Sequence, residues 1–190
     1  HDGVAWVKAA VGAFEPEQDR ITLEDGRPVY YQRLIVAPGI KLDWHGIDGL
    51  VDTLGHNGVT SNYRYDLAPY TWSLISQLRE ERALFTQPPM PKKCSGAPQK
   101  ALYLSAQNWQ RSGAIANIEI AFYNAVQVLL GGIEYVPALM AYIERYNANL
   151  HFAHRLVRID GGARKAWFET STADGEKQQV ETEFDMIHVC

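Results

Sequence analysis

Residues 83–111, ALFTQPPMPKKCSGAPQKALYLSAQNWQR, are the stretch of sequence that determines the predicted fold. They open with a short apolar strand at Ala83–Thr86, which a proline-rich loop ends. Ala97–Arg111 then reads as a helix that has Pro98 in its first turn and Gly113 just beyond its end. A strand that leads through a loop into a helix favours a parallel sheet with helical crossovers.

The sequence around this stretch continues the alternation of strands and helices. Helices are expected at residues 67–78 and 135–146, and strands at 118–123, 150–159, 165–170 and 180–189. This order implies an α/β fold with a parallel sheet and right-handed crossovers. The last strands, which surround the turn Asp160-Gly161-Gly162, are expected to form an antiparallel β flap on that sheet.

The first 62 residues have a different character. Strands are expected at 4–11, 21–23 and 30–36, with the turn signal Asp25-Gly26 before the third, so this part predicts a small antiparallel meander. Such a meander needs a helix or a second sheet to cover it. The glycine-rich residues 41–62 show little periodicity and are expected to form a long connecting loop.

The composition is that of a globular protein with a sizeable core, because 46% of the 190 residues are hydrophobic and 21% are charged. The net charge of -4 argues against nucleic acid as a partner of the chain as a whole. Two cysteines are too few for the disulfide framework of a small secreted protein. No apolar run approaches the roughly 20 residues that cross a bilayer, and no signal peptide opens the chain.

Cys94 is the residue with the clearest chemical potential. It lies between a predicted strand and a predicted helix, whose unpaired N–H groups carry a partial positive charge. Lys92 and Lys93 add two full positive charges. Both effects favour the thiolate, which is the nucleophilic form of cysteine, so we expect a reactive thiol. A buried structural cysteine is the alternative.

Other kinds of site find less support. The junction that holds Cys94 lacks the GxGxxG spacing, and the next strand ends without the acidic residue that binds a ribose hydroxyl, so a nicotinamide nucleotide site is not expected. His151 and His154 lie three apart on a predicted strand and would point to opposite faces. No histidine spacing suggests a metal site. The tryptophans are scattered and form no stacking platform for nucleic acid.

The residues around Cys94 resemble the cysteine motif of the sulfide:quinone oxidoreductases, in particular of the subgroup that contains the mitochondrial enzyme. The motif is Lys93–Lys100, KCSGAPQK, in which Ser95 stands where this subgroup usually has alanine. Similar stretches follow in collinear order over nearly the whole chain: 34–39 (LIVAPG), 42–44 (LDW), 61–63 (SNY), Trp72, 84–86 (LFT) and 185–189 (DMIHV).

The resemblance implies a branch of the flavoproteins that have two dinucleotide folds. Residues 61–190 would form the second domain, which is Rossmann-like (FAD/NAD(P)-binding) with a degenerate nicotinamide site and contains the redox cysteine. Residues 1–60 would supply a partial strip of the flavin domain and the connecting loop. The chain starts at His1 and ends in a strand, so both ends are expected to be cuts through a larger protein.

The resemblance also implies a chemistry. Members of the family oxidise sulfide at a cysteine pair, form a persulfide and pass electrons through FAD to a membrane quinone, with a sulfane-sulfur acceptor as a further partner. Cys94 would be the first cysteine of the pair, and Ala37, Pro38 and Gly39 would form a turn near the flavin. The parent protein would associate peripherally with a bacterial or mitochondrial inner membrane.

The chain departs from the family pattern in ways that limit what it can do alone. It contains no glycine-rich FAD fingerprint, and relatives carry the second redox cysteine and the membrane-binding tail beyond position 190. It is therefore expected to be a soluble, inactive fragment without bound FAD. Cys190 stands where relatives more often have threonine, which favours a structural or incidental residue. Lys100 is either near flavin and substrate or a solvated lysine on the helix.

Three alternatives remain open. The chain could come from an NADH:quinone oxidoreductase or from a flavoprotein like flavocytochrome c sulfide dehydrogenase, which would lack this cysteine motif or carry an intact nicotinamide fingerprint. It could also be a non-catalytic excised domain. Exposed sheet edges of such a fragment could pair two copies into a homodimer.

Overall fold

The structure is a computed structural model that describes residues 3–129, 132–172 and 174–190. It divides into two compact units, one that extends to Ile40 and one that comprises Lys41–Cys190. The domain boundary expected after residue 60 concerns the parent protein and stays a prediction.

The first unit is a three-stranded antiparallel sheet in the order β1-β2-β3 (Val11–Glu15, Arg20–Leu23 and Pro28–Tyr30), with a 3-10 turn at Pro16–Gln18. The meander is therefore confirmed, but the strands expected at 4–11 and 30–36 are wrong in their bounds. Residues 31–40 have no strand partner, and Ile35 is 92% exposed. An apolar run becomes a strand only when another strand satisfies its backbone groups.

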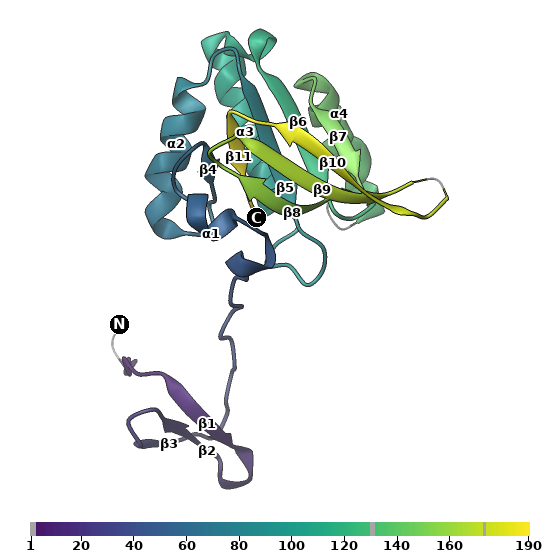
Figure 1. The fold of residues 1–190 in the computed structure, drawn as a ribbon. Coiled ribbons are helices and arrows are strands. Elements are labelled where there is room, and N and C mark those ends of the chain that lie inside the picture. Colours follow the sequence, from purple (N-terminus) through teal and green to yellow (C-terminus); the bar gives the residue numbers. More distant parts are fainter. Residues whose placement is uncertain (1–2, 130–131, 173) are drawn as a thin grey trace. The chain divides into compact units, whose positions relative to one another are not determined.

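The second unit contains a five-stranded parallel sheet in the order β4-β11-β5-β6-β7 (Figure 1). Its strands are Val59–Thr60, Met186–His188, Arg82–Gln87, Glu119–Asn124 and Asn149–Phe152. The predicted parallel α/β sheet is confirmed. Strand β11 lies between β4 and β5, although it is the farthest from both in the sequence.

Helix α1 (Leu50–Thr53) precedes β4, and α2 (Ala68–Gln77), α3 (Ala97–Ser112) and α4 (Val136–Arg145) connect β4, β5, β6 and β7 in turn. Short 3-10 turns lie at Trp44–Gly46, Tyr65–Leu67, Ala114–Asn117 and Ile133–Tyr135. The helices expected at 67–78, 97–111 and 135–146 are confirmed. The expected loop at 41–62 is wrong, because α1 and β4 lie within it and contribute the buried residues Leu50 and Val59.

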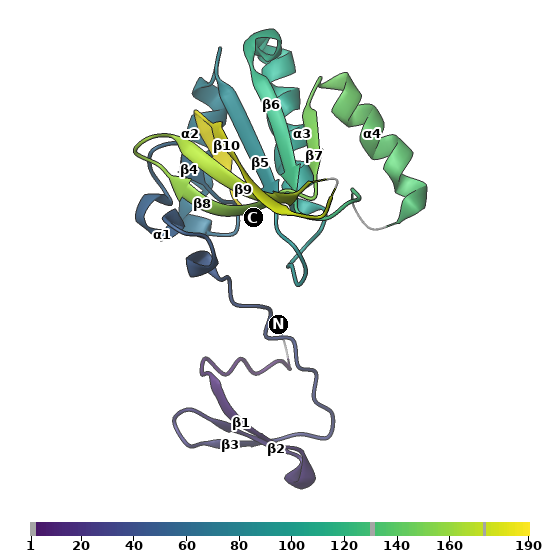
Figure 2. The same cartoon turned by 45° about the vertical axis from the view of Figure 1, so that its right-hand side comes forward.

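Both faces of the parallel sheet are covered, as Figure 2 shows. On one face Phe85 and Phe122 pack with Leu102 and Trp109 of α3 and with Ile143 of α4. The antiparallel flap covers the other face. Because both faces are buried, the central strands β5 and β6 contain the continuous apolar runs 83–85 and 120–123.

The flap is an antiparallel sheet in the order β10-β9-β8 (Lys177–Glu183, Lys165–Ser171 and Arg155–Asp160), which confirms the predicted flap. The strand expected at 150–159 is two strands, β7 and β8, because the left-handed backbone of Ala153 (φ 55) turns the chain from one sheet to the other. The strand expected at 180–189 likewise divides into β10 and β11.

Gly58 permits a close contact between the segments that lead into β4 and β11. Its φ is +81°, and a Cβ atom there would lie 2.1 Å from the carbonyl oxygen of Asp185. We expect Gly58→Ala to lower the free energy of unfolding by about 2 kcal/mol or more, through left-handed strain and this overlap together. Gly113→Ala is the control, because its φ of +79° carries the strain without a neighbour within 4 Å. Equal losses of the two variants in urea unfolding would contradict this explanation.

Candidate functional site

Cys94 lies on the loop between β5 and α3, at the carboxyl edge of the parallel sheet. This edge is where open α/β sheets bind their ligands. Cys94 is exposed. Gly96 precedes the first residue of α3 and Pro98 lies in its first turn, as the sequence predicted. The carbonyl oxygen of Gly96 accepts the first helical hydrogen bond from the N–H of Lys100, at 2.9 Å.

Two buried amide side chains hold the loop through its main-chain oxygen at Ser95. The Nε2 atom of Gln99, a buried residue of α3, donates to the carbonyl oxygen of Ser95 at 3.3 Å. In one orientation of the Gln87 amide, buried at the end of β5, its nitrogen donates to the same oxygen (3.0 Å) and its oxygen accepts from Lys92 Nζ (2.9 Å). In the opposite orientation the nitrogen donates to Asn124 Oδ1 (3.0 Å), which the Gln87 oxygen faces in the first. We prefer the first because it leaves no ammonium facing an amide nitrogen.

The two lysines beside Cys94 have different partners. Burial lowers the pKa of Lys92, whose ammonium lies against the Gln87 amide. The Nζ atom of Lys93 lies 5.4 Å from the ring centroid of Tyr63, a cation–π distance. The Tyr63 hydroxyl in turn lies 3.5 Å from the carbonyl oxygen of Cys94. Both positive charges of the motif therefore stay on this loop, next to the cysteine.

The structure places Cys190 at the same edge of the sheet. Cys190 follows β11, and its N–H donates to Thr86 Oγ1 of β5 at 3.4 Å. Burial raises the pKa of the Cys190 thiol, and charge on Cys94 raises it further. The sequence alone did not predict that the two cysteines lie at the same edge of the sheet, because the pairing of β11 with β5 cannot be read from their order in the chain.

His188 connects Cys190 to the segment after β4. Its side chain is 1% exposed, and burial lowers its pKa to about 4, so the imidazole is neutral at pH 7. Its Nε2 atom accepts from the N–H of Asn62 at 3.1 Å. The ring proton must then be on Nδ1, which lies 3.5 Å from Cys190 Sγ and donates to it.

His151 and His154 do not point to opposite faces, so that expectation is wrong. The turn at Ala153 brings their ring centroids to 5.5 Å from each other. The His151 ring stacks on Tyr123 at 4.4 Å, and Tyr123 stacks on Phe168 at 3.9 Å. Among the residues that the structure describes, no group of three His, Cys, Asp or Glu side chains could hold a metal ion.

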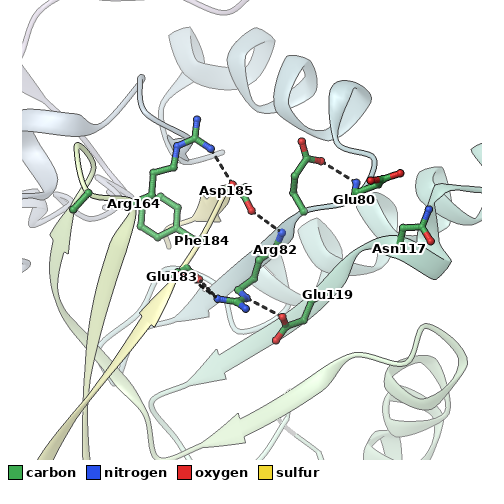
Figure 3. A pocket seen from close by; sticks show the side chains of 10 residues that line it. Glu80, Arg82, Asn117, Glu119, Arg164, Glu183, Phe184 and Asp185 are labelled. Atoms are coloured by element: carbon green, nitrogen blue, oxygen red, sulfur yellow. Dashed lines mark hydrogen bonds and ion pairs between the residues drawn. The ribbon is translucent and has the colours of Figure 1, made fainter.

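A cavity of about 490 Å³ lies at the opposite edge of the sheet, where β5 and β6 begin (Figure 3). Carboxylates dominate its lining, and both of its arginines form ion pairs with them. Arg82 Nε donates to Glu119 Oε2 at 2.8 Å, and one terminal guanidinium nitrogen of Arg164 pairs with Asp185 Oδ1 at 2.9 Å. Such a lining disfavours a dinucleotide diphosphate, because the unpaired charges in it are negative.

Ala37, Pro38 and Gly39 belong to the first unit and Cys94 to the second, so the flavin-side role of this turn stays a prediction. Gly39 has a φ of +75°, and no atom lies within 4 Å of the position that a Cβ atom would occupy, so a ligand could approach its backbone. This open turn is compatible with a flavin.

Comparisons with known proteins point to one family. No family model matches the chain. Curated relatives named mitochondrial sulfide:quinone oxidoreductase, from Dictyostelium discoideum and Mus musculus, are 37% and 32% identical over 188 and 187 residues, which is 98% of this chain. The chain spans about two fifths of the length of these relatives.

Solved structures show the same fold. The sulfide:quinone oxidoreductase from Aquifex aeolicus matches 96% of this chain with a TM-score of 0.71 at 16% identity, over 41% of its own length. NDH2 from Plasmodium falciparum matches 97% with a TM-score of 0.62 at 13% identity, over 40% of its length. None of the helices in the described residues is long and apolar enough to cross a membrane. The chain is therefore a homologue of the mitochondrial sulfide:quinone oxidoreductases and corresponds to about two fifths of their length.

Proposed function

We propose that this chain is the sulfur-binding part of a longer, FAD-dependent sulfide:quinone oxidoreductase, in which Cys94 is the nucleophile and persulfide carrier. The observation that carries the proposal is an exposed cysteine on an anchored loop, in a chain that is similar to this family over nearly its full length. In the longer protein, FAD would be bound near Ala37, Pro38 and Gly39, and association with the membrane would bring the quinone within reach.

The chemistry at Cys94 is a two-electron oxidation. The Cys94 thiolate and hydrosulfide together lose two electrons and one proton as an S–S bond forms between them, which leaves a persulfide on Cys94. FAD supplies a two-electron acceptor when it is bound in the longer protein, and quinone is the final acceptor. A second thiolate then attacks the outer sulfur, carries it away and restores the Cys94 thiolate.

In this proposal the residues around the loop restrict the position of the Cys94 sulfur. Gln87 and Gln99 both hold the carbonyl oxygen of Ser95, and Tyr63 approaches that of Cys94. The peptide groups on the carboxyl side of the sulfur are therefore fixed to buried side chains of the sheet and of α3. A nucleophile held on a rigid frame loses less entropy when it reacts than one on a free loop.

The proposal can be tested on the chain itself with two single-cysteine variants, Cys190→Ser and Cys94→Ser. Each is treated with inorganic polysulfide, which transfers a sulfur atom to a thiolate without a further oxidant, and is then trapped with iodoacetamide. We expect a trapped persulfide on Cys94 in the first variant and little on Cys190 in the second, because Cys190 is only partly exposed and burial raises its pKa. Equal persulfide on both cysteines would contradict the proposed role of Cys94.

A further inference from the structure

Two thiols reach the same edge of the parallel sheet from strands that are neighbours in space. β11 and β5 pair in parallel with His188 opposite Phe85, and this register, continued by two residues, sets Cys190 beside Gln87. The bond from the Cys190 N–H to Thr86 Oγ1 supports this placement. Gln87 is also the residue whose amide reaches the carbonyl oxygen of Ser95, directly after Cys94.

Tyr63 lies beside the main chain of Cys94. It follows β4, the neighbour of β11 on the other side, and its hydroxyl lies 3.5 Å from the Cys94 carbonyl oxygen. Burial raises the pKa of Tyr63 to about 12, and charge on Cys190 and on Cys94 contributes to this rise. Tyr63 therefore connects the Cys94 loop to the segment after β4, whose neighbour β11 leads to Cys190.

The Cys190 sulfur has a hydrogen-bond donor directed at it. The Nδ1–H of the buried His188 donates to Cys190 Sγ, because Nε2 is occupied by the N–H of Asn62. The Thr86 hydroxyl accepts from the Cys190 N–H and donates to the His188 carbonyl oxygen at 3.3 Å. A donor directed at sulfur favours the thiolate that must form when Cys190 attacks, and it opposes the effect of burial.

We propose that Cys190 is a resolving thiol for Cys94, so that an adduct on the exposed Cys94 is converted into a Cys94–Cys190 disulfide. This inference does not depend on sulfide oxidation by the longer protein. It also differs from the pairing implied by the family resemblance, in which the second redox cysteine lies beyond Cys190.

The steps balance with a low-molecular-weight disulfide as the oxidant. The Cys94 thiolate attacks glutathione disulfide, which forms a mixed disulfide on Cys94 and releases one glutathione thiolate. Cys190 then loses its proton and attacks Cys94 Sγ, which forms the internal disulfide and releases the second glutathione thiolate. The exposed thiol thus reacts first and the partly buried thiol second, in the order that their accessibility predicts.

The test treats the chain with glutathione disulfide and maps its cysteines by mass spectrometry after tryptic digestion without reduction. We expect a linked pair of peptides, residues 94–100 (CSGAPQK) and 178–190 (QQVETEFDMIHVC), as the main product. In Cys190→Ser the glutathione adduct should stay on Cys94, and Cys94→Ser should form little adduct. In His188→Gln the adduct should disappear about tenfold more slowly than in the unchanged chain.

Several outcomes would overturn the pairing. One is an adduct on Cys94 that lasts as long in the unchanged chain as in Cys190→Ser. Another is a linked pair that joins two molecules, which a mixture of heavy- and light-isotope chains would reveal. If Cys190→Ser takes up a persulfide from polysulfide but the unchanged chain never forms the linked pair, this inference fails and the proposed function stands. If the linked pair forms but Cys94 never takes up a persulfide, the pairing stands and the proposed function fails.

Discussion

In the proposed sulfide:quinone oxidoreductase, Cys94→Ser is expected to reduce the rate of sulfide-dependent quinone reduction about 1,000-fold or more. Serine is nearly isosteric with cysteine, but its hydroxyl is not ionised near neutral pH and cannot hold a sulfur atom in an S–S bond. The whole covalent path is lost, and loss of a catalytic nucleophile commonly has an effect of this size or larger. The rate is measured from the absorbance of a soluble quinone with sulfide in excess.

The control for this experiment is the integrity of the variant. Cys94 is exposed on a loop whose anchors bind main-chain oxygens, so the serine variant should keep its bound flavin and its unfolding midpoint. A variant that retains more than a tenth of the rate with full flavin content would show that sulfide is oxidised elsewhere.

Trp109→Ala is expected to lower the free energy of unfolding of this chain by about 3–5 kcal/mol, the usual cost of emptying a large aromatic site in a core. Trp109 of α3 is completely buried, and its ring centroid lies 6.3 Å from that of Phe85 in β5. Its Nε1–H donates to the carbonyl oxygen of Ile75 in α2 at 2.7 Å. One side chain therefore holds two helices and the sheet together.

Trp72→Ala provides the matched control, because Trp72 lies on α2 and is 58% exposed. Its replacement should cost less than about 1 kcal/mol. Denaturation should be followed by circular dichroism, since tryptophan fluorescence changes with the substitution itself. Similar losses for the two variants would mean that Trp109 does not have the role that its burial indicates.

The sequence predicts the part of the fold that rests on local signals. In α3 the buried positions recur every three or four residues, among them Leu102, Ala106 and Trp109, and Pro98 and Gly113 mark the two ends. These features depend on residues close together in the chain, so they can be recognised without knowledge of the tertiary structure. The expectation that Cys94 is reactive rests on the same kind of local signal and stays a prediction.

The remaining features depend on contacts between distant segments. The run Leu34–Val36 looks like a strand but has none of the partners that would make it one. Nothing near Cys190 in the sequence shows that β11 pairs with β5 or that His188 turns its Nδ1–H toward the sulfur. The family resemblance suggested a chemistry for Cys94 and favoured a structural or incidental role for Cys190.

The position of β11 has a consequence for how the chain is made. During translation β4, β5, β6 and β7 all emerge before Met186–His188, yet β4 and β5 have no edge in common until β11 fills the space between them. The five-stranded sheet therefore cannot be completed until Met186–His188 leave the ribosome. The insertion of β11 also sets the earliest time at which both cysteines can reach the same edge of the sheet.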